Sequence, residues 1–349
     1  MPPISERLQG AWCDRSGIAL LLLPVALVFR ALVGLRRSLY RLGWLRTERL
    51  PVPVVVVGNL VVGGAGKTPT VRAIVRLLKR SGFRPGIVSR GYGRGDDRVL
   101  AVEPDTAAAL AGDEPLLLRR GAQVPVFVGR DRAAAGRALL QAHPDVDVLV
   151  SDDGLQHLRL ARDAEVVVFD ERGEGNGWLL PAGPLREPLE RHPTARRLVL
   201  YNAPSSTTSL PGFHGARTLA GAVALPDWWA GRAPDAKLLV SLRGRRLTAA
   251  AGLARPERFF AMLRACGLDI EPRPLPDHFD FATLPWSPDT ADAIVTEKDA
   301  VKLRPERVGA TRVWVAALDF VPEPAFETQL LRLLDGHPAR TSADGNPIA

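Results

Sequence analysis

The feature that most constrains this chain is a run of four valines, Val54 to Val57, followed by a glycine-rich turn and then by Lys67 and Thr68. Four consecutive valines are typical of a strand that is buried on both faces. Glycines after such a strand let backbone N–H groups approach phosphate oxygens, and a lysine adds positive charge for the β- and γ-phosphates. A threonine hydroxyl at the next position is suited to Mg²⁺. The order of strand, turn, Lys-Thr and helix therefore predicts a phosphate-binding loop.

We expect the nucleotide phosphates to be bound by one short segment, which consists of Gly63, Gly64, Ala65, Gly66, Lys67 and Thr68. One position departs from the usual pattern, because Val61 stands where a glycine is expected five residues before Gly66. The alternative is a glycine-rich strand-to-helix turn that binds no ligand. The order of the elements around the turn favours phosphate binding.

Apolar strands alternate with helical patterns along the chain, which predicts an α/β fold of the P-loop NTPase-like type. We expect a doubly wound parallel sheet over residues 51–204. Beyond a linker that begins at residue 205, we expect a smaller C-terminal α/β domain up to residue 335, in which the apolar run 238–242 predicts a strand. The final helix, after Pro324, can return to the first domain, and residues 336–349 are predicted to be a disordered tail.

Residues 1–50 contain an unbroken apolar run from Ile18 to Phe29, which Arg30 interrupts and several arginines follow. A bilayer span needs about 20 apolar residues, a length that this run reaches only if the arginine is tolerated. No small-residue cleavage site follows the run, so it does not resemble a signal peptide. We expect a membrane-associated helix that lies in the interface or inserts shallowly, with Trp12, Tyr40 and Trp44 near the headgroups. The alternative is a buried helical hairpin.

An apolar strand over Val148 to Val150 ends in Ser151, Asp152 and Asp153. A carboxylate at the end of a strand near the phosphate loop is what a bound Mg²⁺ requires. We expect one of the two aspartates to contact the metal, because adjacent side chains point in different directions. The alternative is an Asp-Gly turn after a strand. His157, further along, is weak evidence of function by itself.

Asp113 and His278 each admit two interpretations. Asp113 precedes Glu114 and Pro115, so it could cap a helix N-terminus or serve as the base that takes a proton from an attacking hydroxyl. His278 lies either in a surface loop or, when a cleft between the domains closes, over the phosphate site. The residues alone leave both questions open.

Two loops carry further candidates for substrate binding. Arg90 and Tyr92 belong to a glycine- and arginine-rich loop after the strand 86–89, at the sheet edge where ligands bind in open α/β folds. Arg186 and Glu187 end a loop stiffened by prolines, where an arginine fork could clamp a phosphate. A solvated Arg–Glu pair is the alternative for the second loop.

A net charge of +8 suits phosphate-rich ligands, nucleic acid or an anionic membrane. Aromatic residues make up only 6% of the chain and do not interleave with a basic run, which disfavours nucleic acid as a ligand.

Three rival classes of protein remain: a GTPase, a metal-delivery ATPase and a nucleotide-switched membrane protein. The segment from Thr296 to Asp299 resembles a guanine-reading motif, but its lysine and aspartate are adjacent, which is the wrong spacing. The two cysteines are too far apart in sequence to indicate a metal cluster.

Taken in order, the motifs resemble the tetraacyldisaccharide 4′-kinase family of lipid A biosynthesis, from the N-terminal apolar segment to about Leu334. The segments that carry the resemblance are Val57-Gly58-Asn59-Leu60, Gly63-Gly64-Ala65-Gly66-Lys67-Thr68-Pro69, Ser89-Arg90-Gly91-Tyr92-Gly93, Gly112-Asp113-Glu114-Pro115, Asp152-Asp153-Gly154-Leu155-Gln156-His157, Asn176-Gly177, Leu180 to Glu187, Asp277-His278 and Thr296 to Lys302. Each segment is short, whereas the ordered series is specific. The phosphate loop of the family also lacks the first glycine, so Val61 agrees with the resemblance.

The resemblance implies an enzyme that transfers the γ-phosphate of ATP, with Mg²⁺, to the 4′-hydroxyl of a tetraacyldisaccharide 1-phosphate, giving lipid IVA. It implies a P-loop kinase domain over residues 51–204, joined by a two-stranded linker to the second domain. It also implies work at the cytoplasmic face of the bacterial inner membrane. We expect a monomer whose partners are the lipid substrate and the membrane surface, and not nucleic acid.

The resemblance also implies roles for single residues. Lys67 and Thr68 would take the phosphates and the metal, and Asp152 and Asp153 would complete the metal site. Asp113 would be the catalytic base, with His278 as its partner across the cleft. Further candidates for the substrate site are Arg90, Tyr92, Arg132, His157, Asn176, Arg186 and Glu187. For Arg132 the alternative is Arg130, which lies two residues before it.

Overall fold

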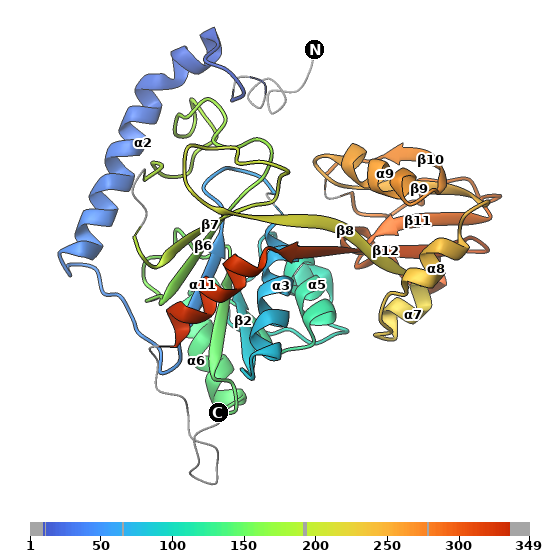
Figure 1. Cartoon of the computed structure of the whole chain (residues 1–349), viewed down its shortest axis with the longest axis horizontal. Helices are drawn as coiled ribbons and strands as arrows, with labels where there is room; N and C mark the ends of the chain where they lie inside the picture. The colour runs from blue at the N-terminus through green and yellow to red at the C-terminus, as the bar shows by residue number, and fades with distance from the viewer. Residues whose placement is uncertain (1–9, 11, 65, 191–193, 278, 336–349) are drawn as a thin grey trace.

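The computed structural model describes residues 10, 12–64, 66–190, 194–277 and 279–335. In this part of the chain the strands form one sheet of twelve, in the order β10-β9-β11-β12-β8-β7-β6-β1-β5-β2-β4-β3. Figure 1 shows two lobes, which two long strands join. The predicted α/β fold with a mostly parallel sheet is confirmed.

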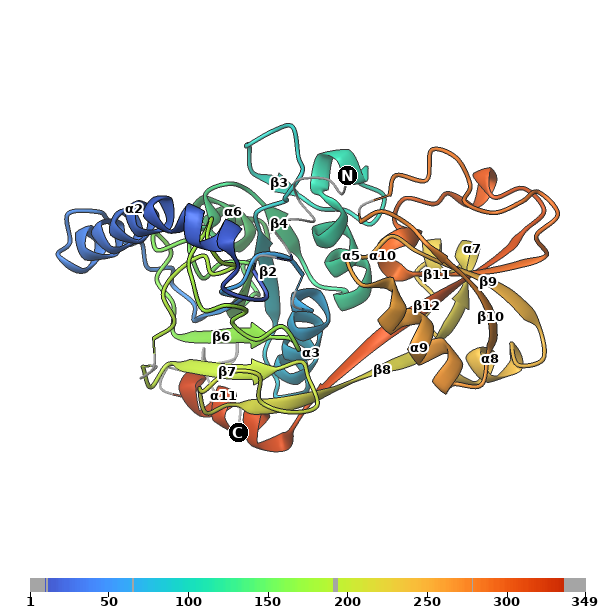
Figure 2. The same cartoon turned by 90° about the horizontal axis from the view of Figure 1, so that it is seen from above.

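The larger lobe is built around β1, which pairs in parallel with β5 on one side and with β6 on the other. Its helices pack on the two faces of the sheet, as a doubly wound fold requires (Figure 2). The strands are β1 (Val54–Gly58), β2 (Pro85–Ser89), β3 (Leu100–Ala101), β4 (Val126–Val128), β5 (Val148–Asp152), β6 (Ala164–Phe169) and β7 (Arg197–Tyr201). The helices are α3 (Lys67–Arg80), α4 (Ala108–Ala111), α5 (Asp113–Ala122) and α6 (Arg132–Ala142).

The four valines of β1 are buried, as a central strand covered on both faces requires. Val55 and Val57 point into the core cluster that includes Ile74 and Leu78 of α3. Val54 and Val56 point into the cluster on the opposite face. The strand therefore alternates between two cores, and its last residue delivers the chain to the turn before α3.

The smaller lobe contains a parallel sheet of three strands, in which β9 lies between β10 and β11. Its elements are α7 (Leu225–Trp229), α8 (Ala236–Ser241), β9 (Arg246–Ala251), α9 (Pro256–Ala265), β10 (Asp269–Pro274), β11 (Asp292–Thr296), α10 (Glu297–Ala300) and a 3₁₀ turn at Pro305–Arg307. The predicted strand at 238–242 is wrong, because this segment belongs to α8. The Asp235 side chain caps that helix by accepting from the Lys237 backbone N–H, and only one face of the helix is buried. A short apolar run does not distinguish the two states by itself.

Two antiparallel strands, β8 (Phe213–Ala224) and β12 (Arg312–Pro322), run from one lobe to the other. The near end of β8 pairs in parallel with β7 of the larger lobe. The far end of β12 pairs with β11 of the smaller lobe. After β12, α11 (Pro324–Leu334) packs back on β6 and β7. The domain boundaries drawn from the sequence remain a prediction, and the tail 336–349 lies outside the described residues.

The N-terminal helix α2 (Gly17–Arg41) extends along one side of the larger lobe (Figure 1). By length and composition it could cross a membrane, which is weak evidence by itself. Only Ala19 and Ala26 of this helix are buried, and several of its large apolar side chains, including Leu21, Val28 and Leu32, are exposed, whereas Phe29 packs against the core. A buried helical hairpin, the alternative for this segment, is therefore wrong. Trp12, which precedes the helix, donates from Nε1 to the Pro181 carbonyl oxygen.

Candidate active site

The candidate site lies where the carboxyl ends of β1, β5 and β2 meet. These three strands run in parallel, so the turns that follow them gather at the same edge of the sheet. The turn after β1 contributes Lys67, the end of β5 contributes Asp152 and Asp153, and the end of β2 contributes Ser89. Residues predicted from separate stretches of sequence are thereby brought together.

Lys67 is almost completely buried at the start of α3. Its ammonium lies 3.2 Å from Asn59 Oδ1 and 3.4 Å from Asp153 Oδ1. Gly66 precedes it with a φ of +78°, a conformation that glycine adopts without strain. Thr68 follows and is only partly exposed. Gly63 and Gly64 are exposed, and Ala65 lies outside the described residues.

Two side chains brace the glycine turn from behind. Asn59, fully buried, donates from its amide to the carbonyl oxygens of Val61 and Gly63, at 2.6 and 2.9 Å. Arg172 donates to the carbonyl oxygens of Val62 and Gly64, at 3.1 and 3.0 Å. These bonds engage carbonyl groups of the turn and hold its backbone, and N–H groups in a turn of this kind favour an anionic ligand. No role for either side chain was predicted from the sequence.

Asp152 is buried at the end of β5, where Oδ2 accepts a 3.0 Å hydrogen bond from the Ser89 hydroxyl. Its Oδ1 is buried and has no hydrogen-bond partner among the described residues. Burial raises the pKa of Asp152 to about 7, and the nearby carboxylate of Glu114 adds to the effect. A buried carboxylate that lacks a partner is a suitable ligand for a cation, which would keep it ionised.

Groups of three or more metal-ligating side chains do not occur in the described part of the chain. Mg²⁺ in kinases is held by one or two carboxylates, substrate phosphates and water, and does not need such a group. The donors at this edge of the sheet, Thr68, Asp152 and Asp153, are oxygen ligands of the kind that Mg²⁺ prefers. The residues present therefore fit the predicted metal.

Asp153 pairs with two cations. Arg186 Nη1 lies 3.1 Å from its Oδ1, and Lys67 approaches the same oxygen. Burial acts to raise the pKa of Asp153, but the charges of Lys67 and Arg186 outweigh it and the pKa is lowered. Asp153 has a φ of +49°, which Asp tolerates better than most residues. Arg186 thus pairs with Asp153, and the alternative of a solvated pair between Arg186 and Glu187 is wrong.

Arg132, and not Arg130, belongs to the site. Arg132 is buried and donates from Nη2 to the Asp153 carbonyl oxygen at 3.0 Å, whereas Arg130 is exposed and pairs with Asp97. Burial lowers the pKa of the Arg132 guanidinium. His157 lies behind this arginine, with Nε2 3.6 Å from Asp131 Oδ1. Burial, together with the charge of Arg132, lowers the pKa of His157 to about 4, so this imidazole is neutral near pH 7.

Asp113 is the first residue of α5. Gly112 occupies the N-cap position, so the capping interpretation of Asp113 is wrong. Asp113 Oδ2 instead lies 3.1 Å from Lys302 Nζ of the smaller lobe. Lys302 also donates to the Phe279 carbonyl oxygen at 3.0 Å. His278 lies outside the described residues.

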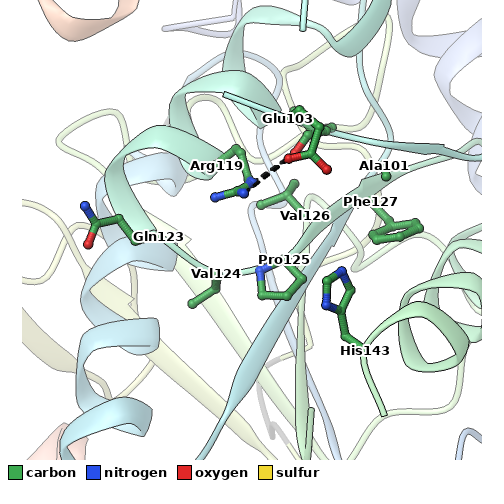
Figure 3. A pocket seen from close by; sticks show the side chains of 10 residues that line it. Ala101, Glu103, Arg119, Gln123, Val124, Pro125, Val126, Phe127 and His143 are labelled. Atoms are coloured by element: carbon green, nitrogen blue, oxygen red, sulfur yellow. Dashed lines mark hydrogen bonds and ion pairs between the residues drawn. The ribbon is translucent and has the colours of Figure 1, made fainter. Parts of the chain in front are cut away.

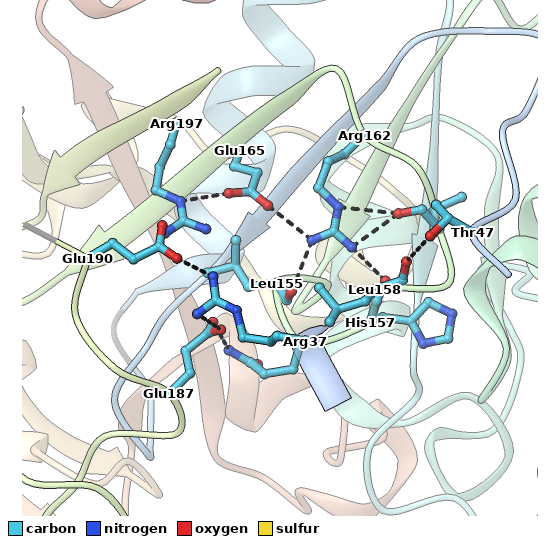
Figure 4. A network of polar contacts seen from close by, with 12 residues as sticks. Arg37, Thr47, Leu155, His157, Leu158, Arg162, Glu165, Glu187, Glu190 and Arg197 are labelled. Carbon is cyan, nitrogen blue, oxygen red and sulfur yellow. Dashed lines mark hydrogen bonds and ion pairs between the residues drawn. The ribbon is translucent and has the colours of Figure 1, made fainter. Parts of the chain in front are cut away.

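Glu187 belongs to a network of polar contacts that reaches α2, as Figure 4 shows. Its carboxylate accepts a 3.0 Å hydrogen bond from Gln156 and lies 3.5 Å from Arg37 of α2. Arg37 also pairs with Glu190. Further ion pairs extend the network through Arg197, Glu165 and Arg162. Glu187 therefore connects the N-terminal helix to the turn that carries Asp153.

The remaining predicted residues have different surroundings. Asn176 is buried and donates to the carbonyl oxygens of Asp14 and Ala182, at 3.1 and 2.9 Å, so it shapes the loop that leads to Arg186. Arg90 and Tyr92 are exposed at the end of β2, where their loop packs against Gly112. The segment from Thr296 to Asp299 serves the fold. Asp299 is fully buried and accepts from the Gly252 N–H, which agrees with the argument against guanine reading.

A small cavity of about 140 Å³ lies away from this edge of the sheet (Figure 3). It is lined by the segment before β4 and by the C-cap of α6, at the opposite end of β4 from Arg132. Its one ion pair joins Arg119 to Glu103 at 3.3 Å.

A glycine-rich turn that opens a helix after β1, together with the buried carboxylate of Asp152 on the neighbouring strand β5, is typical of a P-loop phosphotransferase. The family model for tetraacyldisaccharide-1-P 4′-kinase matches residues 18–335. The chain therefore belongs to the tetraacyldisaccharide 4′-kinase family.

Individual relatives agree with the family match. The tetraacyldisaccharide 4′-kinase of Leptothrix cholodnii is 57% identical over 97% of each chain. That of Acidovorax sp. is 50% identical over 99% of this chain and 98% of its own. Among solved structures, LpxK from Aquifex aeolicus in complex with ATP superposes with a TM-score of 0.76. It is 28% identical and is matched over 91% of this chain and 99% of its own.

The family predicted from the motifs, the fold class and the kinase activity toward a hydroxyl group are confirmed. Use of ATP and Mg²⁺ follows from membership of a kinase family, and a lipid A precursor is the substrate that the family implies. A GTPase and a metal-delivery ATPase are thereby set aside.

Proposed function

We propose that this chain transfers the γ-phosphate of ATP to the 4′-hydroxyl of a tetraacylated glucosamine disaccharide 1-phosphate, giving lipid IVA. The hydroxyl oxygen forms a bond to the γ-phosphorus while the bond to the β-phosphate oxygen breaks, ADP leaves, and the hydroxyl proton passes to a base. One observation carries the proposal at the level of residues. The buried Lys67 faces Asp153, beside an oxygen of Asp152 that lacks a partner among the described residues.

In this reaction the N–H groups of the glycine turn cradle the phosphate chain, and Lys67 stabilises charge on the β- and γ-phosphates. Thr68, Asp152 and Asp153 would hold Mg²⁺, which would neutralise charge on the phosphates. The binding of the turn's carbonyl groups by Asn59 and Arg172 keeps its N–H groups oriented before the nucleotide arrives. Such preorganised donors lower the barrier without a later cost of reorganisation.

Asp113 takes the proton from the 4′-hydroxyl in this proposal. It stands at the start of α5, with Lys302 of the smaller lobe 3.1 Å away, so both lobes contribute to the place where the acceptor reacts. His278 acts as its partner, a role that rests on the family motif. Closure of the lobes around the acceptor excludes water, which would otherwise hydrolyse ATP.

Substrate contacts are assigned to the side chains around this centre. Arg132 and Arg186 both contact Asp153, which supports a role for them in binding phosphate oxygens. Glu187 and Asn176 hold the loop that presents Arg186. His157, a neutral ring near Arg132, adds no further positive charge beside that guanidinium. The exposed Arg90 and Tyr92 lie at the open edge of the site, where a lipid headgroup can reach them.

The lipid acceptor explains the outward-facing apolar surface of α2. Leu21 is 80% exposed, and Val28, Leu32 and Leu35, which lie along the same face of the helix, are about 60% exposed. An exposed apolar patch of this kind marks an interaction surface. We assign it to the cytoplasmic face of the bacterial inner membrane, where a monomer of this chain would meet its lipid substrate.

A phosphoryl-transfer assay tests the proposal, with radiolabelled ATP, Mg²⁺ and the disaccharide 1-phosphate in mixed detergent micelles. The wild type should form one product that carries label at the 4′ position. For Lys67→Ala and Asp113→Ala we expect kcat to fall by roughly several hundredfold, as the loss of transition-state contacts or of a general base predicts. Failure of the wild type to phosphorylate this acceptor would refute the assignment. Near-normal kcat in Asp113→Ala would refute only the role of the base.

A further inference from the structure

Arg217 of β8 lies directly against the last glycine of the phosphate loop. A Cβ added to Gly66 would stand 2.2 Å from Arg217 Nη2 and 1.9 Å from the amide nitrogen of Asn202. Gly66 is also the N-cap of α3, so this guanidinium lies at the N-terminus of the helix that follows the loop. Arg217 reaches this position from the middle of a strand that joins the two lobes, where it pairs with Phe320 of β12.

The guanidinium of Arg217 is short of partners. Its Nε is buried and has no hydrogen-bond partner among the described residues. Burial lowers the pKa of Arg217, and the like charge of Arg258 acts in the same direction. The acidic groups that oppose this effect, Asp170 and Glu171, are engaged elsewhere. Asp170 binds Arg172, and Glu171 pairs with Arg255 and Arg258.

Arg217 is half-buried as a residue, but a charged group with a buried N–H that lacks a hydrogen bond is costly unless an acceptor completes it. Here the neighbouring groups are the N–H groups of a phosphate loop and a helix N-terminus, which favour phosphate. A guanidinium adds a planar pair of donors that match two phosphate oxygens. The chemistry around Arg217 therefore fits a phosphate group of the nucleotide.

The sheet order indicates which part of the nucleotide reaches Arg217. Asp153, which faces Lys67, follows β5 on one side of β1. Asn202 follows β7, and Arg217 belongs to β8, both on the other side of β1. If the reacting γ-phosphate of ATP lies toward Asp153, the α- and β-phosphates lie on the other side of the loop, toward β7 and β8.

We infer that Arg217 binds the phosphate chain of ATP near its nucleoside end, at the α- and β-phosphates, and is thus a nucleotide-binding residue supplied by the strand that joins the lobes. The inference rests on the proposed ATP site at the phosphate loop. It differs from a contact to the transferred phosphate, because ADP retains every group that Arg217 binds.

Binding of MgADP and MgATP to Arg217→Ala, measured by titration calorimetry on the full chain in detergent, tests the inference. We expect both dissociation constants to rise about 10- to 100-fold, as the loss of a charge-assisted hydrogen bond predicts. In the phosphoryl-transfer assay, KM for ATP should rise by a similar factor. The KM for the lipid acceptor should stay unchanged, and kcat at saturating ATP should change by less than about threefold.

Two results would overturn the inference. Unchanged MgADP affinity together with an unchanged KM for ATP would show that Arg217 does not bind the nucleotide. Unchanged MgADP affinity with a large loss of kcat would place Arg217 on the transferred γ-phosphate instead. Both results are read with a wild type that is an active kinase, so they are distinct from failure of the proposed function.

Two further variants separate binding from folding. Arg258→Gln is the matched control, because it removes a nearby positive charge that is paired with Glu171, and it should leave MgADP affinity within about twofold. Arg217→Lys keeps the charge but not the planar fork, so its affinity should lie between those of the wild type and Arg217→Ala. If Arg217→Ala does not fold, Arg217→Lys decides, and wild-type MgADP affinity in that variant would contradict the inference.

Discussion

Lys302 Nζ lies 3.1 Å from Asp113 Oδ2, so an ion pair joins the two lobes at the proposed proton acceptor. Both side chains are largely shielded from solvent, and Lys302 is also fixed by its bond to the Phe279 carbonyl. The pair gives the smaller lobe a direct influence on the position of the base. In the proposed mechanism, the pair would link closure of the lobes to the chemistry of the larger one.

We predict that Lys302→Ala lowers kcat by about 10- to 100-fold, because a base misplaced by about 1 Å loses rate on this scale. The KM for ATP should change little, since Lys302 belongs to the other lobe and contacts the base, not the phosphate loop. Steady-state kinetics with each substrate varied in turn measures both quantities. Lys302→Arg keeps the charge and should recover part of the lost kcat. A kcat of Lys302→Ala equal to that of the wild type would refute the positioning role.

Much of the site could be predicted because parallel strands bring their carboxyl ends together. Lys67 after β1 and Asp152 at the end of β5 were predicted separately, and the pairing of β1 with β5 places them at one edge. The contact between Asp113 and Lys302 could not be predicted, because it depends on how far the long strands carry the smaller lobe. The segment from Thr296 to Lys302 is part of the family resemblance, but nothing in its spacing indicates that Lys302 pairs with Asp113.

Local sequence patterns also did not predict which side chains are buried in the site. Arg130 and Arg132 are equivalent as sequence, yet only Arg132 points inward, because Asp131 caps α6 and fixes the orientation of its first turn. Asn59 directly follows the buried strand β1, a position from which a side-chain amide can fold back on the turn. This was the available signal for its role in bracing the loop. The run 238–242 was predicted as a strand, but a short apolar run of this length is compatible with either a strand or a helix.

A second prediction concerns the docking of α2. Arg37 is the residue of this helix that pairs with both Glu187 and Glu190. Arg37→Ala leaves the buried carboxylate of Glu187 with less compensation, at a cost of about 1–3 kcal/mol. We expect a fall of a few degrees in the melting temperature in detergent and a higher KM for the lipid acceptor.

The matched control for this variant is Arg41→Ala, because Arg41 is exposed on the same helix. It should melt within about one degree of the wild type, since an exposed substitution changes stability by less than about 0.5 kcal/mol. Equal effects of the two substitutions would mean that the network around Glu187 does not hold the helix.

The apolar face of α2 supports a third prediction. The triple variant Leu21→Gln, Leu32→Gln and Leu35→Gln removes three strongly exposed leucines from one face of the helix. Because burial of each leucine contributes roughly 1.5–3 kcal/mol, partitioning into vesicles of anionic phospholipid should fall at least tenfold. Flotation of the protein with sucrose-loaded vesicles measures this quantity.

The control also replaces three exposed apolar residues by Gln, but outside α2, at Leu110, Val240 and Val321, which are 50 to 57% exposed. Replacement of these three residues by Gln should leave vesicle partitioning within about twofold of the wild type. If both triple variants lose partitioning equally, a specific membrane face on α2 is contradicted.

The last prediction concerns pH. Burial lowers the pKa of His157 in the folded chain to about 4, below the value of about 6.5 expected when it is unfolded. Between these two values the unfolded chain binds a proton that the folded chain does not, so His157 makes the fold less stable as the pH falls from about 6.5 toward 4. With allowance for partial solvent screening, the full effect is on the order of 1–2 kcal/mol.

His157→Gln cannot take up the proton, so its melting temperature relative to that of the wild type should be a few degrees higher at pH 5 than at pH 7.5. Melting curves of both proteins in one detergent at each pH measure this difference. A difference that stays constant over this range would show that the folded chain does not hold the ring neutral.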